Sequence, residues 1–417
     1  MPRSSAIPIR PVARAAVHSA LAFGLPTTWD THGLTQWLTT HRPANPSNPA
    51  HPEHPPDPVA QAEAAPRQVA LDRLGRPWRT LRLSVTDRCN FRCGYCMPRS
   101  HFGPGHAFLP RDQVLSFEEM VAVARCGLDM GLQKVKITGG EPLLRRDLPL
   151  LIESLSSLHR AKGHPPLELG MTTNGSLLTR HADELRQAGL TRLNISLDAI
   201  DRTTFSQMAD VDVPLTQVLD GIEAARRAGF DHIALNTVVR PGHNVDQLPS
   251  LARHAAEMNC TLRLIEYMDV GNANGWAPDH VLTLGDMLDQ LGGRHLWEAQ
   301  PRRHPGQTAR PFRHRHTGQR IEVVASISQP FCSQCDRWRL SADGHLYNCL
   351  FATQGMDIRP WLRADASPPL RAQALATCLT LAWKHRAEQH SADRSRMPQA
   401  SPGTPSRAKV EMSHVGG

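Results

Sequence analysis

A repeated unit in the middle of the chain most constrains its fold. Three segments begin with a glycine suited to a helix C-terminus, continue with alternating apolar residues and end in a polar residue: Gly131–Thr138, Gly189–Ser196 and Gly229–Asn236. A helix is predicted before the first segment, because Ser116 and Glu119 form a capping box ahead of an apolar stripe. The repetition of helix, glycine, strand and polar end predicts an α/β fold with a parallel sheet.

Three further strands are predicted at Leu81–Val85, Leu167–Met171 and Arg263–Tyr267. Six βα units are enough for a partial (βα)6 barrel, in which catalytic residues gather at the carboxyl ends of the strands. The polar residues Thr138, Ser196 and Asn236 at these ends either terminate the strands as turn formers or belong to a site. Their repetition beside a cysteine-rich loop favours a site.

That loop places Cys89, Cys93 and Cys96 in a C-x3-C-x2-C pattern directly after the first predicted strand. In a four-iron cluster each iron needs one external ligand, so three cysteines leave one iron open to bind a small molecule. A structural zinc ion would need a fourth ligand that this loop does not obviously offer. The pattern therefore favours an open iron–sulfur cluster over a structural metal.

A second thiol group, Cys332, Cys335 and Cys349, follows a predicted strand at Ile321–Ser328. From its spacing alone, zinc and an iron–sulfur cluster are equally good interpretations. Clustered thiols in a long chain indicate metal binding in a reducing compartment. Cys378 lies instead on the apolar stripe of a predicted helix and is expected in the core.

Charge and composition narrow the classes of partner. The formal charge of +8, from 47 Lys and Arg against 39 Asp and Glu, suits a compact phosphate ligand. It does not favour a nucleic acid, because no basic run is interleaved with aromatic residues. No apolar run approaches the roughly 18 residues of a membrane span, so we expect a soluble, cytoplasmic protein without a membrane partner.

Three regions are expected along the chain. Residues 1–70 are rich in proline from Pro43 to Pro58 and are expected to form a disordered or loosely structured extension. Residues 71–300 are expected to form the barrel. Residues 301–417 are expected to form a C-terminal, cluster-binding region with a flexible Gly416-Gly417 tail.

The stretch from Leu81 to Pro98 resembles the cluster motif of the radical S-adenosylmethionine (SAM) superfamily, and its flanks resemble the GTP 3′,8-cyclase family of molybdenum cofactor synthesis. The resemblance runs from about Leu71 to Gly417. It implies two [4Fe–4S] clusters, the first binding SAM and the second meeting the guanine of GTP. It also implies a lyase that makes (8S)-3′,8-cyclo-7,8-dihydroguanosine 5′-triphosphate by abstracting the ribose 3′ hydrogen and joining C3′ to C8. The alternative is a radical SAM enzyme with an auxiliary cluster that acts on a peptide.

The resemblance also implies roles for individual residues. SAM contacts are expected at Tyr95, at Gly140 and Glu141 in the GGEP segment, at Ser196 and at Met268. Substrate contacts are expected at Arg82, Lys136, Thr172, Arg263, Arg337, Trp338 and Arg339. Arg82, Arg337 and Arg339 are also expected to be catalytic, as is the Gly416-Gly417 tail, which reaches into the active site in this family. As a group, cations on barrel strands favour a triphosphate, because they are costly to bury without an anionic partner.

The sequence departs from the family at one position, where Ala234 replaces a lysine that commonly contacts substrate phosphate. Either a neighbour such as Lys134 or His232 compensates, or the affinity for the substrate is lower. The expected partners are GTP, a reductant or electron-donor protein, and cyclic pyranopterin monophosphate synthase as the next enzyme. The chain is expected to be a monomer or a homodimer.

Overall fold

The computed structural model describes residues 25, 28–41, 69–158, 165–393 and 409–416. Its strands form one mixed sheet in the order β12-β11-β10-β1-β2-β3-β4-β5-β6-β9-β8-β7. The six central strands are parallel: β1 (Thr80–Ser84), β2 (Lys134–Thr138), β3 (Glu168–Thr173), β4 (Arg192–Ser196), β5 (Ile233–Val239) and β6 (Thr261–Glu266). The predicted α/β array of six parallel strands is therefore confirmed.

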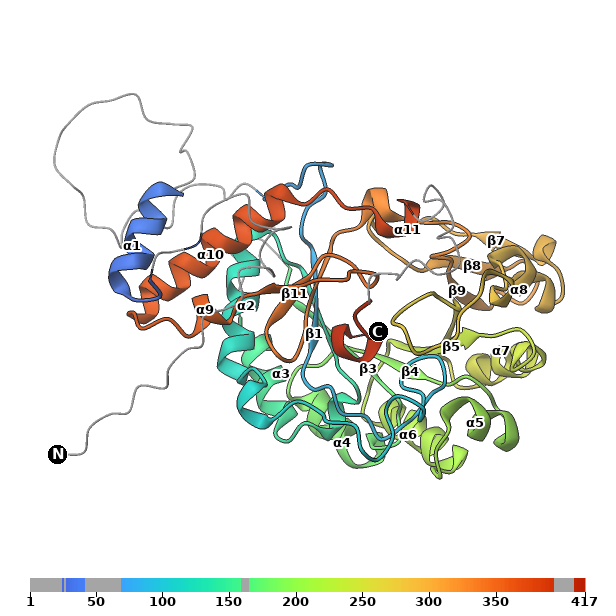
Figure 1. Ribbon diagram of the computed structural model, residues 1–417. Helices are drawn as coiled ribbons and strands as arrows, with labels where there is room; N and C mark the ends of the chain where they lie inside the picture. Colours follow the sequence, from blue (N-terminus) through green and yellow to red (C-terminus); the bar gives the residue numbers. More distant parts are fainter. Residues whose placement is uncertain (1–24, 26–27, 42–68, 159–164, 394–408, 417) are drawn as a thin grey trace.

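Helices cover the outer face of this curved sheet (Figure 1). They are α2 (Phe117–Met130), α3 (Leu148–Ser156), α4 (Leu178–Gln187), α5 (Arg202–Ala209), α6 (Leu215–Arg227) and α7 (Leu248–Glu257). The predicted capping box begins α2: the Ser116 hydroxyl accepts from the Glu119 amide, and the Glu119 carboxylate accepts from the Ser116 amide at 2.7 Å. Gly131 follows α2 with a φ of 108°, a left-handed conformation that favours glycine.

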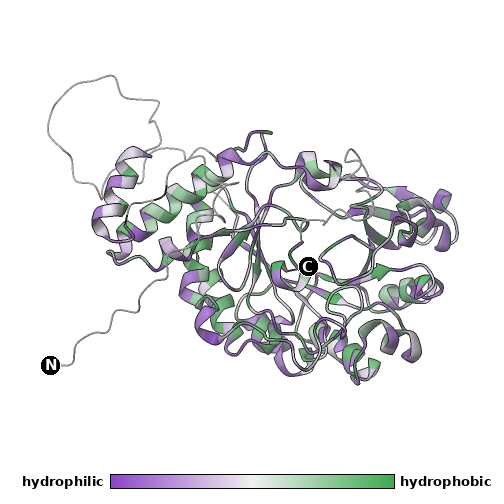
Figure 2. Cartoon of the chain, in the orientation of Figure 1, coloured by the Kyte–Doolittle hydropathy of each residue, from purple (hydrophilic) through white to green (hydrophobic). Residues whose placement is uncertain are grey.

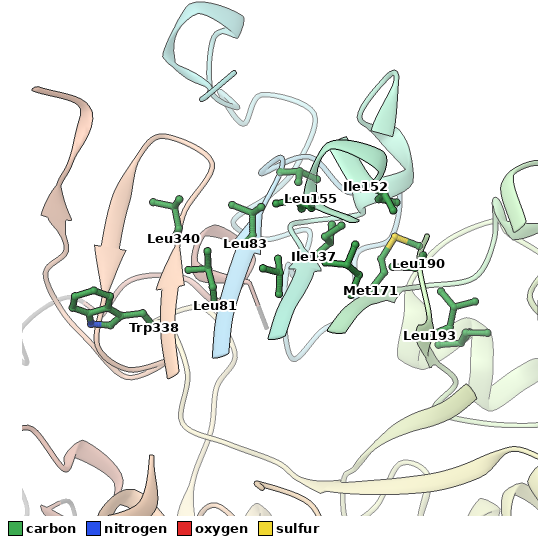
Figure 3. Packing of buried hydrophobic residues seen from close by; sticks show 14 of the residues in the cluster. Leu81, Leu83, Ile137, Ile152, Leu155, Met171, Leu190, Leu193, Trp338 and Leu340 are labelled. Carbon is green, nitrogen blue, oxygen red and sulfur yellow. The ribbon is translucent and has the colours of Figure 1, made fainter. Parts of the chain in front are cut away.

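The core lies between the sheet and these helices. Because side chains alternate along a strand, Leu81 and Leu83 point into the core while Arg82 points to the concave side. Figure 3 shows the buried residues of neighbouring strands packing side by side. In Figure 2 the helices carry their apolar residues toward the sheet and their polar residues outward. The concave face is thereby left for polar side chains.

Strands from the C-terminal region extend both edges of the sheet. At one edge β10 (Arg337–Leu340) pairs with β1 in parallel, followed by β11 (His345–Tyr347) and β12 (Met356–Asp357). At the other edge β9 (Arg320–Val324) pairs with β6 in parallel, followed by β8 (Arg310–His314) and β7 (Trp297–Ala299), with α8 (Leu284–Gln290) preceding them. The sheet runs without interruption across the predicted boundary near residue 300.

A helix occupies part of the N-terminal extension, where a loosely structured segment was predicted. Asp30 caps α1 (Thr31–Thr40) by accepting from the Gly33 amide at 2.8 Å. Trp37 of α1 is buried against Trp361 of α9 (Arg359–Leu362), and α1 also contacts α10 (Pro368–His385). The prediction overlooked this apolar face because it was based on the prolines that follow, which lie outside the described residues. None of the described helices has both the length and the apolar character needed to cross a membrane.

Candidate active site

The first thiol group lies on the loop after β1. Burial raises the pKa of the Cys93 thiol, and the nearby charges of Asp198, Cys96 and Cys89 raise it further. Burial, together with the charge of Glu141, raises the pKa of Cys89 to about 12. Three mutually close sulfurs from one loop are a donor set that fits an iron–sulfur cluster, which binds the thiolates once their protons are lost.

The GGEP segment after β2 packs directly on this cysteine loop. The Gly140 amide donates to the Thr86 carbonyl and the Glu141 amide to the Arg88 carbonyl, both at 2.8 Å. A Cβ atom at Gly140 would lie 2.2 Å from the Arg88 carbonyl oxygen, so only glycine permits this approach. The two loops therefore form one rigid unit at the carboxyl ends of β1 and β2.

Glu141 is 1% exposed, and its carboxylate holds the end of β3 in place. It accepts from the Thr173 hydroxyl at 2.7 Å, from the Asn174 amide at 2.7 Å and from the Leu143 amide at 3.1 Å. Burial raises its pKa to about 7. The structure thus shows a scaffolding role for this carboxylate, while its contact with SAM stays a prediction.

The other residues predicted to contact SAM lie around the same rim. The Tyr95 hydroxyl donates to Asp198 at 2.7 Å, which ties the cysteine loop to the segment that follows Ser196 at the end of β4. Met268 follows β6 and lines the central cavity. Four different strand ends thus surround the cysteine loop with the predicted residues.

The second thiol group faces a central cavity of about 180 Å³ on the concave side of the sheet, lined by Cys332, Cys335 and Cys349. The Cys335 sulfur accepts from Arg337 at 3.3 Å and from Arg386 at 3.2 Å. Burial alone would raise the pKa of this thiol, but the two guanidinium charges outweigh burial and lower it to about 6. Three thiols on one wall of a cavity, one of them held beside two cations, also fit an iron–sulfur cluster.

Five cations from four strands line the same cavity. They are Arg82 of β1, Lys136 of β2, Arg263 of β6, and Arg337 and Arg339 of β10, and Thr172 of β3 lies with them. Burial lowers the pKa of Arg82, and the charges of Arg339, Arg337 and Arg263 lower it further. Burial and repulsion from Arg337 lower the pKa of Arg339 to about 10. The predicted cations are therefore brought together, where their repulsion favours a polyanionic ligand.

The Trp338 side chain does not line this cavity, and its predicted contact with the substrate stays a prediction. Figure 3 labels Trp338 among the buried hydrophobic residues. The side chain is 1% exposed and packs against Trp78 and Trp383 on the opposite face of β10. The reason is the alternation of strand side chains, since Arg337 and Arg339 can only share the cavity face if Trp338 points away from it.

Asn236, which ends one of the repeated segments, lines the cavity as its strand-end position suggested. Several other cavity residues were not predicted. They are Ile265, Thr308, Val324, Ser326, Phe331, Asn348, Leu350, Phe351 and Ser391. Thr308 and Ser391 come from irregular parts of the chain, which carry no periodic pattern. A larger hollow of about 1330 Å³ is lined by α7, β8 and β9 and contains His232, but none of the residues predicted to bind a cluster, SAM or GTP.

The C-terminal tail enters the space between the two thiol groups. Figure 1 shows α12 (Met412–Val415) inside the mouth of the sheet. Met412 packs near Cys93 and Cys96, whereas Val415 packs near Cys349. The Gly416 carbonyl accepts from Arg82 at 3.1 Å and also from Arg339. The tail therefore reaches the predicted site, while Gly417 lies outside the described residues.

This arrangement defines an α/β iron–sulfur enzyme of the radical SAM superfamily. Residues 83–255 match the Radical SAM superfamily, and residues 260–392 match Molybdenum Cofactor Synthesis C. The protein named GTP 3′,8-cyclase from Acidothermus cellulolyticus is 44% identical over 362 residues, covering 83% of this chain and 98% of that protein. One from Staphylococcus haemolyticus is 41% identical over 347 residues with the same coverages. The chain belongs to the GTP 3′,8-cyclase family.

Among solved structures, the chain is similar to SuiB from Streptococcus suis bound to its precursor peptide SuiA. The TM-score is 0.48 at 14% sequence identity, covering 72% of this chain and 67% of that one.

Proposed function

We propose that this chain is a lyase that converts GTP to (8S)-3′,8-cyclo-7,8-dihydroguanosine 5′-triphosphate in molybdenum cofactor biosynthesis. The observation that carries the proposal is the shared cavity, in which the second thiol group faces the half-buried cations Arg82, Lys136, Arg263, Arg337 and Arg339. A peptide substrate would not need such a concentration of positive charge. A nucleoside triphosphate supplies both the anionic groups and a base to meet the thiol-bearing wall.

The protein's own residues bind and orient the substrate in this proposal. Lys136 forms no ion pair with any residue in the described part of the chain, and its pKa is lowered by burial and by the charge of Arg82. The Lys136 ammonium group is thus suited to pair with a phosphate of the substrate. Arg263 is already paired with Glu322 at 2.6 Å, so it contributes a fixed rather than a mobile charge. A GTP molecule bound by these cations would present its ribose and base in one orientation. Such orientation supplies most of what the abstraction of the ribose 3′ hydrogen needs.

The two thiol groups would hold two [4Fe–4S] clusters, which with SAM supply the radical chemistry when bound. In the described residues, no three His, Cys, Asp or Glu side chains are grouped to hold a single metal ion. A cluster bonds each sulfur to a different iron, so its ligands need not meet around one ion. The free state of all six cysteines is consistent with a reducing compartment, and we place the enzyme in the cytoplasm on that ground.

Two measurements test the proposal. Iron and sulfide analysis of the anaerobically reconstituted chain is expected to give two four-iron clusters and no zinc. Anaerobic incubation with GTP, SAM and a reductant is then expected to give 5′-deoxyadenosine and an isomer of GTP by mass analysis. Formation of 5′-deoxyadenosine without any GTP isomer would count against GTP as the substrate.

A further inference from the structure

A buried ion cluster of Asp72, Arg76 and Arg386 lies behind the second thiol group. Asp72 accepts from Arg76 at 2.6 Å and from Arg386 at 3.3 Å, and all three side chains are at most 2% exposed. Asp72 and Arg76 precede β1, whereas Arg386 caps the end of α10. Two guanidinium groups against one carboxylate leave an excess positive charge in a place that water does not reach.

This ion cluster touches each of the three segments that carry a cysteine. Arg76 donates to the Cys332 carbonyl at 2.8 Å. Arg386 donates to the Cys335 carbonyl at 2.8 Å, and to the carbonyl of Asn348, the residue before Cys349, at 3.3 Å. The three thiols, which are far from Asp72 in the sequence, are therefore tied to a single buried anchor.

Arg386 also contacts a thiol directly, because its Nη2 donates to the Cys335 sulfur at 3.2 Å. The guanidinium lies 4.7 Å from the centre of the Trp383 ring, and the Trp383 indole donates to the Arg76 carbonyl at 2.9 Å. The orientation of Arg386 is thus restricted from several sides. An N–H donor to a ligand sulfur and a nearby positive charge both favour the reduced form of an iron–sulfur cluster.

We propose that Arg386 is a positioning residue for the second cluster: anchored by Asp72 and acting with Arg76, it holds the three cysteines in place for a four-iron cluster and makes that cluster easier to reduce. The inference rests on the proposed function, because it requires an iron–sulfur cluster at this thiol group. It extends that function to residues outside the proposed SAM and GTP contacts. It also gives a reason for the excess positive charge of Asp72, Arg76 and Arg386 in the core.

The test uses the full chain carrying Cys89→Ser, Cys93→Ser and Cys96→Ser, so that only the second cluster contributes iron and spectroscopic signals. In this parent, Arg386→Lys keeps a positive charge but cannot bridge the carbonyls and the sulfur at once. Arg371→Lys is the matched control, since Arg371 lies on the same helix and donates to the Ala364 and Ala366 carbonyls, away from the cysteines. The two readouts are the rate of iron release to a chelator and the midpoint potential from a redox titration.

Arg386→Lys is expected to release iron about ten- to a hundredfold faster, the usual effect of losing a partner of a metal ligand. Its midpoint potential is expected to become more negative, while Arg371→Lys leaves both readouts unchanged. Arg76→Lys supplies a second test: it should speed iron release with a smaller change in potential, because Arg76 contacts a carbonyl and no sulfur.

Unchanged release and potential in Arg386→Lys would overturn the inference while leaving the proposed function intact. Equal shifts of potential in Arg386→Lys and Arg76→Lys would also overturn it, because the sulfur contact would then be irrelevant. A parent that binds zinc in place of four iron atoms would instead overturn the proposed function, and the inference with it.

Discussion

The two thiol groups contain the same number of cysteines in opposite electrostatic surroundings. Burial raises the pKa of Cys96, and the charges of Cys89, Glu411 and Asp198 raise it further. At Cys335, by contrast, Arg337 and Arg386 lower the pKa to about 6 despite burial. Negative neighbours disfavour an added electron and positive ones favour it. The contrast teaches that the residues around the ligands, more than the ligands themselves, distinguish the two thiol groups.

The two groups also differ in how they are held. The first comes from one short loop, fixed by backbone hydrogen bonds to the GGEP segment. The second is assembled from three segments through Asp72, Arg76 and Arg386. The first group therefore comes from consecutive residues that a neighbouring loop holds in place, whereas the second brings together cysteines from separate parts of the chain.

Removing one cysteine from each group tests whether the two thiol groups have separate tasks. Cys93→Ala is expected to abolish both SAM cleavage and GTP cyclisation, because the first cluster loses a ligand. Cys335→Ala is expected to abolish cyclisation while 5′-deoxyadenosine still forms, because the two groups have separate tasks. The measurement is quantification of both products in the same anaerobic assay. Loss of SAM cleavage in Cys335→Ala, with the first cluster intact by spectroscopy, would contradict the division of tasks.

A neutral residue of similar size at Lys136 tests the role of the half-buried cations. Lys136→Met is expected to weaken GTP binding by roughly 2–5 kcal/mol, because a charge partner of the phosphates is lost. It should raise the melting temperature of the ligand-free protein, because the partial desolvation of Lys136 and its repulsion from Arg82 are removed. Lys134→Met is the control, since Lys134 is paired with Glu168. Calorimetric titration and thermal unfolding of both variants check the two signs.

The tail that lies between the two groups can be displaced by one methyl group. A Cβ atom at Gly416, which has a φ of 70°, would lie 2.1 Å from the Thr138 hydroxyl and 2.8 Å from the Ser84 hydroxyl. Gly416→Ala is therefore expected to lower turnover by about a hundredfold, as a small misplacement in an active site does. Both clusters should remain, as judged by iron content. Deletion of Gly416 and Gly417 should have the same pattern, and normal turnover after deletion would refute a role for the tail.

Ala234 allows the cation-rich region to be strengthened. It lies on β5 beside Asn194 and Thr261. It is two residues before Asn236, which lines the cavity, so the two side chains lie on the same face of the strand. Because Lys134 is engaged by Glu168, it is a poor substitute for a lysine at this position. Ala234→Lys is expected to tighten GTP binding about tenfold, or about 1.4 kcal/mol. Unchanged or weaker binding in a titration would count against a phosphate at this place.

The acid-rich surroundings of the first group predict a pH dependence of stability in the cluster-free protein. Burial raises the pKa of Asp198 from 3.8 to about 6. Because the unfolded chain releases this proton first, Asp198 makes stability fall as the pH rises from about 4 to about 6, and Glu141, whose pKa is raised to about 7, extends the fall toward pH 7. Asp198→Asn can keep its partners Tyr95 and Val238, and it should show a smaller fall below pH 6. Melting temperatures of both proteins between pH 4 and pH 7 measure the effect.

Much of the site could be predicted before the structure was known. The glycine-punctuated repeat located three of the six parallel strands, alternating apolar residues located the other three, and the ends of the strands showed where polar residues would meet. Alternation along β10 also predicts that the Trp338 side chain faces away from Arg337 and Arg339, as the structure shows. The helix at Thr31–Thr40 was missed because its apolar face is stabilised by packing on Trp361, a residue far away in the sequence.

Local periodicity in the amino-acid sequence was sufficient for the strands, their faces and the two groups of cysteines, because side-chain direction follows directly from strand and helix geometry. Only the tertiary structure brought Asp72, Arg76 and Arg386 behind Cys335, and placed the tail between the two groups. Those contacts join residues that are hundreds of positions apart, and their free energy comes from shared burial. A local sequence pattern cannot predict these contacts, because they stabilise the chain only once the whole sheet has formed.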